Sequence, residues 1–104
     1  MEASEKAMEL LSDEGGKLSA PPDLGIQRVE ALKKDLLEAL GDARDQVVMS
    51  LKDVSRMDTA AVQVLLAAKK SADGLGRGFV LEDPSEACSE LTKQLGLFSV
   101  LFES

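Results

Sequence analysis

Histidine, tryptophan and tyrosine are missing from this chain of 104 residues, which contains one cysteine and three phenylalanines. The absence of histidine removes the commonest general base, the serine–histidine catalytic arrangements and most zinc sites. A single cysteine forms no disulfide within the chain and builds no metal cluster. We therefore expect a protein that is not an enzyme and that has no cofactor or metal site.

Positive charge is also scarce, because 12 basic residues stand against 19 acidic ones and the net charge is −7. This balance argues against nucleic acids and anionic membrane surfaces, which are bound chiefly through lysine and arginine. It suits a protein partner that presents basic residues. No apolar run reaches the length of a membrane-spanning helix, and the acidic start MEASEKAMELL lacks a signal-peptide layout. We expect one domain, in the cytoplasm.

The first part of the chain is predicted to form a hairpin. Residues 1–7 are polar, and we expect them to be a flexible extension. The apolar run Met8–Leu11 is followed by the turn Ser12–Gly16 and by a returning strand over Lys17–Ala20. The spacing of the apolar residues also allows a helix over residues 3–11, and both alternatives stay open.

A helix is predicted after the prolines. Pro21 and Pro22 end any regular structure, since neither can donate to a strand ladder, and Asp23–Gly25 is expected to be a loop. Gln27–Leu40 is predicted to be an amphipathic helix with Gly41 as its glycine cap. Its apolar face comprises Val29, Leu32, Leu36 and Leu40.

The most informative stretch is Val47–Leu66. It begins with VVMSL, a short apolar run typical of a buried strand. A polar connection then leads to Thr59, directly before the predicted helix Ala60–Asp73. Asp58 or Thr59 can cap this helix with a side-chain oxygen. A helix N-terminus carries partial positive charge and tolerates an added phosphate, so Thr59 is suitably placed for a phosphorylation switch.

The last part of the chain is predicted to be strand, helix and strand. Gly74–Gly78 ends the preceding helix, and Phe79–Leu81 is a short strand. Asp83 is the expected cap of a helix over Ser85–Leu95, with Pro84 in its first turn. Leu97–Phe102 is a final apolar segment that completes the alternation of strands and helices. This order predicts an α/β domain with a mixed sheet, in which Cys88 of the third helix has a buried packing role.

The central motif L-x-x-V-x-x-M-D-[ST]-[SA]-[GA], present as LKDVSRMDTAA at residues 51–61, resembles that of the STAS domain family. This family includes the bacterial anti-sigma factor antagonists and related partner-switching adaptors. VEALKKDLLEAL resembles the family's first helix, and GRGFVLEDPSEACSELTKQLGLFSVL resembles its final turn, strand, helix and closing segment. The resemblance covers residues 8–104. It implies one STAS-like α/β domain with a mixed sheet of four to five strands against about three to four helices.

The resemblance also implies a site. Thr59 falls on the family's phosphorylated hydroxyl residue, where many members have serine. The implied partners are a GHKL-type serine/threonine kinase that doubles as an anti-sigma factor, and an opposing phosphatase. Phosphorylated members often carry G-x-L-D before the first helix. Here the aligned residues are P-D-L-G, so Gly25 stands where they have aspartate and Asp23 lies two residues away.

The candidate partner-binding residues are Asp23, Asp58, Thr59, Val62 and Leu66. Thr59, Val62 and Leu66 recur at helical spacing, on a face separate from the core face of Ala61, Val64, Leu65, Ala68 and Ala72. An apolar stripe beyond the core face often marks a binding surface. The alternative is that Val62 and Leu66 are buried against a neighbouring element.

Two functions follow from these observations. The first is a protein–protein interaction switch that resembles the anti-sigma factor antagonists and is regulated by phosphorylation of Thr59. The second is a constitutive, non-phosphorylated STAS adaptor in a chemotaxis-linked signalling assembly or a lipid-transport ATPase assembly.

Overall fold

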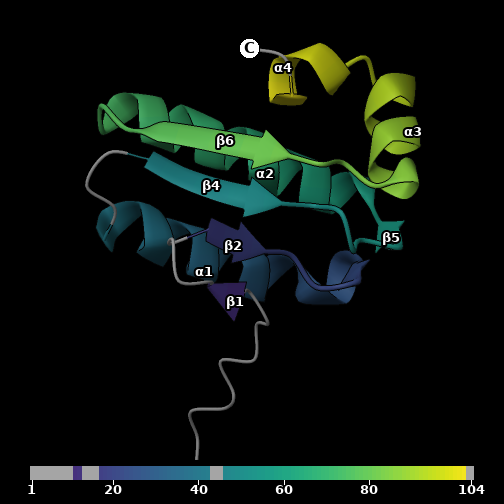
Figure 1. Ribbon diagram of the computed structural model, residues 1–104, viewed down its shortest axis with the longest axis horizontal. Coiled ribbons are helices and arrows are strands. Elements are labelled where there is room, and N and C mark those ends of the chain that lie inside the picture. Colours follow the sequence, from purple (N-terminus) through teal and green to yellow (C-terminus); the bar gives the residue numbers. More distant parts are fainter. Residues whose placement is uncertain (1–10, 13–16, 43–45, 103–104) are drawn as a thin grey trace, which may run out of the picture.

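A mixed four-stranded sheet forms the centre of the computed structural model, which describes residues 11–12, 17–42 and 46–102 (Figure 1). Its strands are β1 (Leu11–Ser12), β2 (Lys17–Ser19), β4 (Gln46–Ser50) and β6 (Gly78–Glu82), in the spatial order β1-β2-β4-β6. β1 is antiparallel to β2, whereas β2, β4 and β6 are parallel. The predicted extension over residues 1–7 and the alternative helix over 3–11 lie outside the described residues, except for Leu11.

Two long helices lie side by side behind the sheet in the view of Figure 1. They are α1 (Val29–Asp42), which continues the 3₁₀ turn η2 (Ile26–Arg28), and α2 (Thr59–Gly74). Each joins two parallel strands, which need such a crossover. Two shorter helices follow β6: α3 (Glu86–Gln94) and α4 (Phe98–Phe102). The prediction of an α/β domain with a mixed sheet is confirmed.

The core lies between the sheet and the two long helices. Leu18, Met49 and Leu81 are register partners across β2, β4 and β6, and all three are buried. From α1 the predicted apolar face contributes three fully buried leucines, Leu32, Leu36 and Leu40. Burial of each such side chain contributes about 1.5–3 kcal/mol to the free energy of folding. Leucine, valine, alanine and methionine dominate this core, as the scarcity of aromatic residues requires.

The predicted loop Asp23–Gly25 contains a short strand instead. β3 (Asp23–Leu24) pairs in parallel with β5 (Arg56–Met57), forming a separate two-stranded sheet. Pro22 has no N–H to donate, but its carbonyl accepts hydrogen bonds from the backbone amides of Ser55 at 2.8 Å and Arg56 at 3.1 Å. The prolines therefore end β2 without preventing a new ladder, because that ladder uses the acceptor that proline retains.

The closing segment Leu97–Phe102 contains the helix α4 rather than the predicted strand. α3 ends in a Schellman motif, in which Gly96 has a φ of +73° and the Leu97 amide bonds to the Thr92 carbonyl at 2.8 Å. This turn redirects the chain into α4, which buries Leu101 and leaves Val100 half exposed. The expected end of α2 is confirmed, with Gly76 at a φ of +72° in the same motif.

Two helix boundaries differ from the prediction. Ser85, not Asp83, is the cap of α3, and its hydroxyl accepts a hydrogen bond from the Cys88 amide at 3.1 Å. Asp83 has a φ of 54° and belongs to the turn before the helix. Gly41 lies inside the last turn of α1, which continues to Asp42. Among the described residues, no helix is both long and apolar enough to cross a membrane.

Candidate functional site

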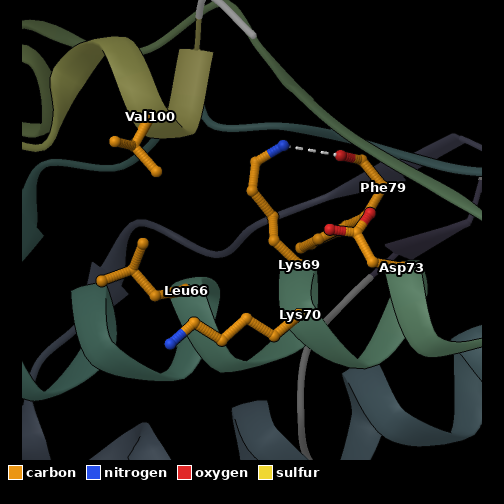
Figure 2. A pocket seen from close by; sticks show the side chains of 6 residues that line it. All are labelled: Leu66, Lys69, Lys70, Asp73, Phe79 and Val100. Carbon is orange, nitrogen blue, oxygen red and sulfur yellow. Dashed lines mark hydrogen bonds between the residues drawn. The ribbon is translucent and has the colours of Figure 1, made fainter.

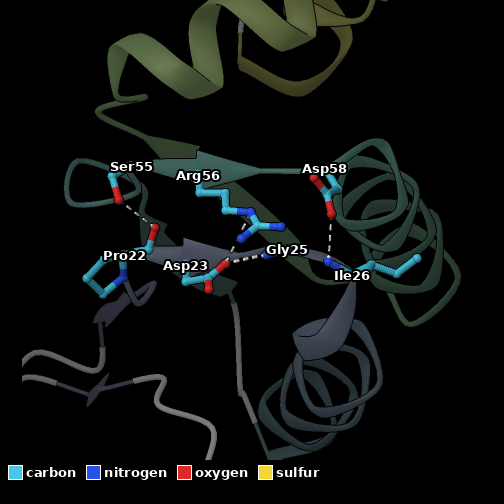
Figure 3. Close-up of polar contacts among 7 residues, drawn as sticks. All are labelled: Pro22, Asp23, Gly25, Ile26, Ser55, Arg56 and Asp58. Carbon is cyan, nitrogen blue, oxygen red and sulfur yellow. Dashed lines mark hydrogen bonds and ion pairs between the residues drawn. The ribbon is translucent and has the colours of Figure 1, made fainter.

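The N-terminus of α2 meets the β3–β5 sheet and the turn η2, and this junction forms the candidate site (Figure 3). Asp58 stands at the predicted cap position of α2, but its side chain does not bond to its own helix. Its Oδ2 atom instead accepts a hydrogen bond from the backbone amide of Ile26 at 2.7 Å. Of the two predicted cap residues, Asp58 and Thr59, the structure has Asp58 at the cap position, but the predicted side-chain hydrogen bond to the helix is not formed. The contact between Asp58 and Ile26 fastens η2 to the start of α2.

Ile26 is the first residue of the turn η2 and has an exposed apolar side chain. It is 64% exposed, the largest value among the exposed large apolar residues of the described chain. The turn is closed by the Arg28 amide, which donates to the Gly25 carbonyl at 2.9 Å. A further backbone bond joins the Asp58 amide to the Leu24 carbonyl at 3.3 Å. Ile26 is thus an exposed apolar side chain whose backbone is held in place from two sides.

Thr59 is the first residue of α2, and it is exposed. The first amides of a helix have no partner within the helix and give this end partial positive charge. The Asp58 carbonyl accepts from the amides of Ala61 at 3.0 Å and Val62 at 3.3 Å, which closes the first turn. The Thr59 hydroxyl therefore lies at a well-formed helix start, next to the residue that holds Ile26.

Asp23 and Arg56 pack around Gly25. The Asp23 Oδ1 atom accepts a hydrogen bond from the Gly25 amide at 2.8 Å and lies 4.0 Å from the Arg56 Nε atom. A Cβ atom built on Gly25 would lie 3.0 Å from that oxygen and 3.2 Å from the Arg56 Nε atom. The carboxylate of Asp23 thus reaches the space beside position 25, although Asp23 is two residues earlier in the chain. Glycine at position 25 leaves the room that this carboxylate and guanidinium occupy.

The predicted stripe of Thr59, Val62 and Leu66 does not exist on the surface, because Val62 is completely buried and Leu66 is half-buried. The buried residues of α2 are Ala61, Val62, Leu65, Ala68 and Ala72. This arc includes Val62 and leaves Val64 at its flank, so the prediction misjudged the rotation of the helix. Val62 is part of the core and is not available to a partner in the folded chain.

The structure brings Asp23, Asp58 and Thr59 to the same junction and adds two residues that were not among the candidate site residues, Ile26 and Arg56. The side chain of Arg56 is 65% exposed, and Figure 3 shows its guanidinium beside Asp23 and Gly25. The available signal for Ile26 was an isolated isoleucine between the predicted loop Asp23–Gly25 and the predicted helix Gln27–Leu40. Nothing in the local sequence marked Arg56, because its surroundings come from the loop more than 30 residues earlier. Among the described residues, no group of three or more carboxylates, cysteines or histidines is placed to hold a metal ion.

Comparisons with known proteins agree with this architecture. Residues 8–101 match the family model described as "Mlab, STAS domain". The chain therefore belongs to the STAS domain family. The comparison with curated proteins found no match.

Three solved structures share the fold. A putative anti-sigma factor antagonist from Thermotoga maritima gives a TM-score of 0.74 at 18% identity, covering 95% of this chain and 87% of that chain. The unphosphorylated form of the anti-sigma factor antagonist SpoIIAA gives a TM-score of 0.66 at 18% identity, covering 78% of this chain and 71% of that chain. A protein described as Mglu gives a TM-score of 0.61 at 22% identity, covering 77% of this chain and 20% of that chain. This likeness shows that the chain shares the fold of the anti-sigma factor antagonists.

Proposed function

We propose that this chain is a non-enzymatic protein-interaction switch of a bacterial cytoplasm, resembling the anti-sigma factor antagonists, and that phosphorylation of Thr59 by a GHKL-type serine/threonine kinase controls it. Its docking surface comprises Ile26, Arg56, Asp58 and Thr59, with Asp23 at the border. The observation that carries the proposal is the exposed residue Thr59 at the start of α2, beside an exposed isoleucine whose backbone amide is held by Asp58.

Ile26 has the properties of an interface anchor. Because the backbone of Ile26 is already held in place, docking of its side chain in a pocket of the partner requires no ordering of the turn that carries it. Arg56 adds a guanidinium, a group that is enriched among residues dominating binding energy. The carboxylates of Asp23 and Asp58 border this pair, and the whole chain has a net charge of −7. A partner with an apolar pocket rimmed by basic residues is complementary to this surface.

A phosphate on Thr59 would add a charge of about −1.5 to −2 at neutral pH. The partial positive charge of the helix start stabilises that phosphate in the free protein. In a complex, the same phosphate lies beside the Asp58 carboxylate. It must then be desolvated, which is unfavourable, or form an ion pair with a basic group of the partner. Docking of Ile26 against an apolar pocket is then weakened, or redirected to a partner that presents arginines.

The test is phosphorylation by the serine/threonine kinase encoded beside this chain. The protein is incubated with that kinase and ATP, and the phosphate is located by mass spectrometry. We expect one phosphate on Thr59 and none in Thr59→Ala, while Ser55→Ala, which removes the exposed hydroxyl of the same junction, is phosphorylated normally. Phosphate on another residue, or no phosphate at all, would disprove the switch.

The alternative is a constitutive adaptor in a chemotaxis-linked or lipid-transport ATPase assembly. One observation favours it: Gly25 replaces the aspartate of the phosphorylated members, and the Asp23 carboxylate nearby already bonds to the Gly25 amide. For an adaptor we expect Thr59→Ala to bind its assembly with unchanged affinity and Ile26→Ser to lose binding. Neighbouring genes for a chemotaxis kinase or a transport ATPase, rather than a sigma factor, would favour this alternative.

A further inference from the structure

A second surface lies on the other half of α2, where a groove separates this helix from α4 (Figure 2). Its volume is about 330 Å³, and its lining residues are Leu66, Lys69, Lys70, Asp73, Phe79 and Val100. Leu66 points up from α2 and Val100 points down from α4, so two aliphatic side chains face each other across the groove. Val100 is 50% exposed. An apolar side chain of a partner would find aliphatic contacts on both sides here.

Lys69 adds a cation to this groove, and its Nζ atom lies 5.9 Å from the centroid of the Phe79 ring. Its Nζ atom donates to the backbone carbonyl of Phe79 at 2.9 Å, on the edge strand β6. Within the described part of the chain, this neutral carbonyl is the one hydrogen-bond partner of the ammonium, which has three donors. Burial lowers the pKa of Lys69, although the nearby Asp73 carboxylate raises it. A carboxylate from a partner would use the remaining donors and offset the loss of water around Lys69.

The charge of the groove contrasts with that of the whole protein. Two lysines and one aspartate line it, whereas the chain has a net charge of −7. The two lysines therefore favour an acidic group at this groove in spite of the negative net charge of the chain. An anionic membrane would be better suited by a flat, basic face than by a groove. The pair of aliphatic side chains and the local positive charge together fit a peptide that carries both aliphatic and acidic residues.

The groove is separate from the proposed docking surface. Leu66 lies about two turns, or roughly 10 Å, along α2 from Thr59, and Lys70 and Asp73 lie farther on. Leu66 therefore belongs to this groove rather than to the surface around Thr59. A ligand here does not require phosphorylation of Thr59, and its binding can be measured independently of the proposed switch.

We propose that the groove between α2 and α4 binds a short acidic–aliphatic segment of a protein partner, with an aliphatic side chain between Leu66 and Val100 and a carboxylate on Lys69 and Lys70. This is a second interaction surface of the domain. It gives the chain two contact regions on one helix, one at the N-terminus of α2 and one at its C-terminal half.

The experiment is an NMR titration of the ¹⁵N-labelled chain with the acetylated and amidated peptide Glu-Leu-Glu-Leu. We expect saturable shifts at the amides of Leu66, Lys69, Lys70 and Val100. The peptides Lys-Leu-Lys-Leu and Glu-Ser-Glu-Ser, which lack the acidic or the aliphatic groups, should bind at least about tenfold more weakly. Equal binding of either control peptide, or shifts elsewhere in the protein, would overturn the proposal.

Variants separate this surface from general charge effects. The double variant Lys69→Gln/Lys70→Gln should bind the peptide at least about fivefold more weakly. Lys34→Gln, on the exposed side of α1, should bind it with unchanged affinity. Val100→Ser should lower the affinity for the peptide and leave the thermal unfolding temperature unchanged, because this side chain is half exposed. Sedimentation with phosphatidylglycerol vesicles tests the membrane alternative. Binding to vesicles through Lys69 and Lys70, with no binding of the peptide, would replace the proposed partner by a lipid surface.

Discussion

The Asp58 carboxylate accepts a hydrogen bond from the Ile26 amide at 2.7 Å, across 32 residues of sequence. This contact joins the exposed isoleucine to the helix that begins with Thr59. The residue before the candidate phosphorylation site therefore also fixes the candidate anchor. A charge added to Thr59 would act directly beside this bond.

Replacement of Asp58 by alanine should release the turn η2. We expect the free energy of unfolding to fall by about 1 kcal/mol, the value for a typical hydrogen bond, because this contact is exposed to solvent. The Ile26 amide should exchange with solvent faster, which hydrogen-exchange NMR measures. Asp58→Asn keeps an acceptor oxygen and should retain part of the protection. Unchanged exchange at Ile26 in Asp58→Ala would mean that this hydrogen bond does not hold the turn.

Replacement of Ile26 by serine should affect binding more than folding. The side chain is 64% exposed, so the free energy of unfolding should change by no more than about 0.5 kcal/mol. Loss of an anchor should raise the Kd of the complex with the partner at least about tenfold, which titration calorimetry measures. Leu75→Ser, at a residue 54% exposed beyond the other end of α2, is the matched control and should bind normally. Equal effects of both variants would place the docking surface elsewhere.

Replacement of Val62 by aspartate should unfold the domain. Val62 is completely buried, and a carboxylate there would have no compensating partner, at a cost of at least about 3 kcal/mol. Gln63→Asp, at the exposed neighbouring position, should cost no more than about 0.5 kcal/mol. Urea unfolding of the two variants makes the comparison. A folded, stable Val62→Asp would show that Val62 is not part of the core.

Replacement of Leu65 by alanine should lower the free energy of unfolding by roughly 2–5 kcal/mol, because a buried leucine leaves a cavity. Leu37→Ala, in α1, removes a side chain that is 46% exposed and should cost clearly less. The measurement is the urea midpoint at constant slope. A loss below about 1 kcal/mol for Leu65→Ala would mean that the surrounding side chains close the cavity.

Stability should fall in alkaline solution through Cys88. Burial raises the pKa of this thiol, and hydrogen bonds with Ser85 only partly oppose that effect. Above about pH 8.5 the unfolded chain therefore loses the thiol proton first, binds fewer protons than the folded chain, and is favoured as the pH rises. Cys88→Ala should show a smaller loss of stability between about pH 8 and pH 10 in urea unfolding. Parallel pH profiles of the two proteins would contradict this.

Periodic features of the fold were predictable from the sequence. Leu32, Leu36 and Leu40 recur at helical spacing, and VVMSL has four apolar residues in five, so the local pattern predicts burial of both segments. The glycine that ends α2 was predictable for a similar reason, because the motif needs a positive φ at one position. The closing segment was not predictable, since a short apolar run suits a strand or a helix equally well.

For the candidate site, the sequence by itself determined that a hydroxyl residue, Thr59, follows an acid at the start of an apolar helix, because helix propensity and capping chemistry act over a few neighbouring residues. Only the tertiary structure decided that the Asp58 carboxylate binds the Ile26 amide, that the Asp23 carboxylate fills the space beside Gly25, and that Val62 is buried. These outcomes depend on the rotation of α2 and on how the β3–β5 sheet places two distant loops together. No local pattern encodes such a rotation, because it is set by packing against all neighbouring elements at once.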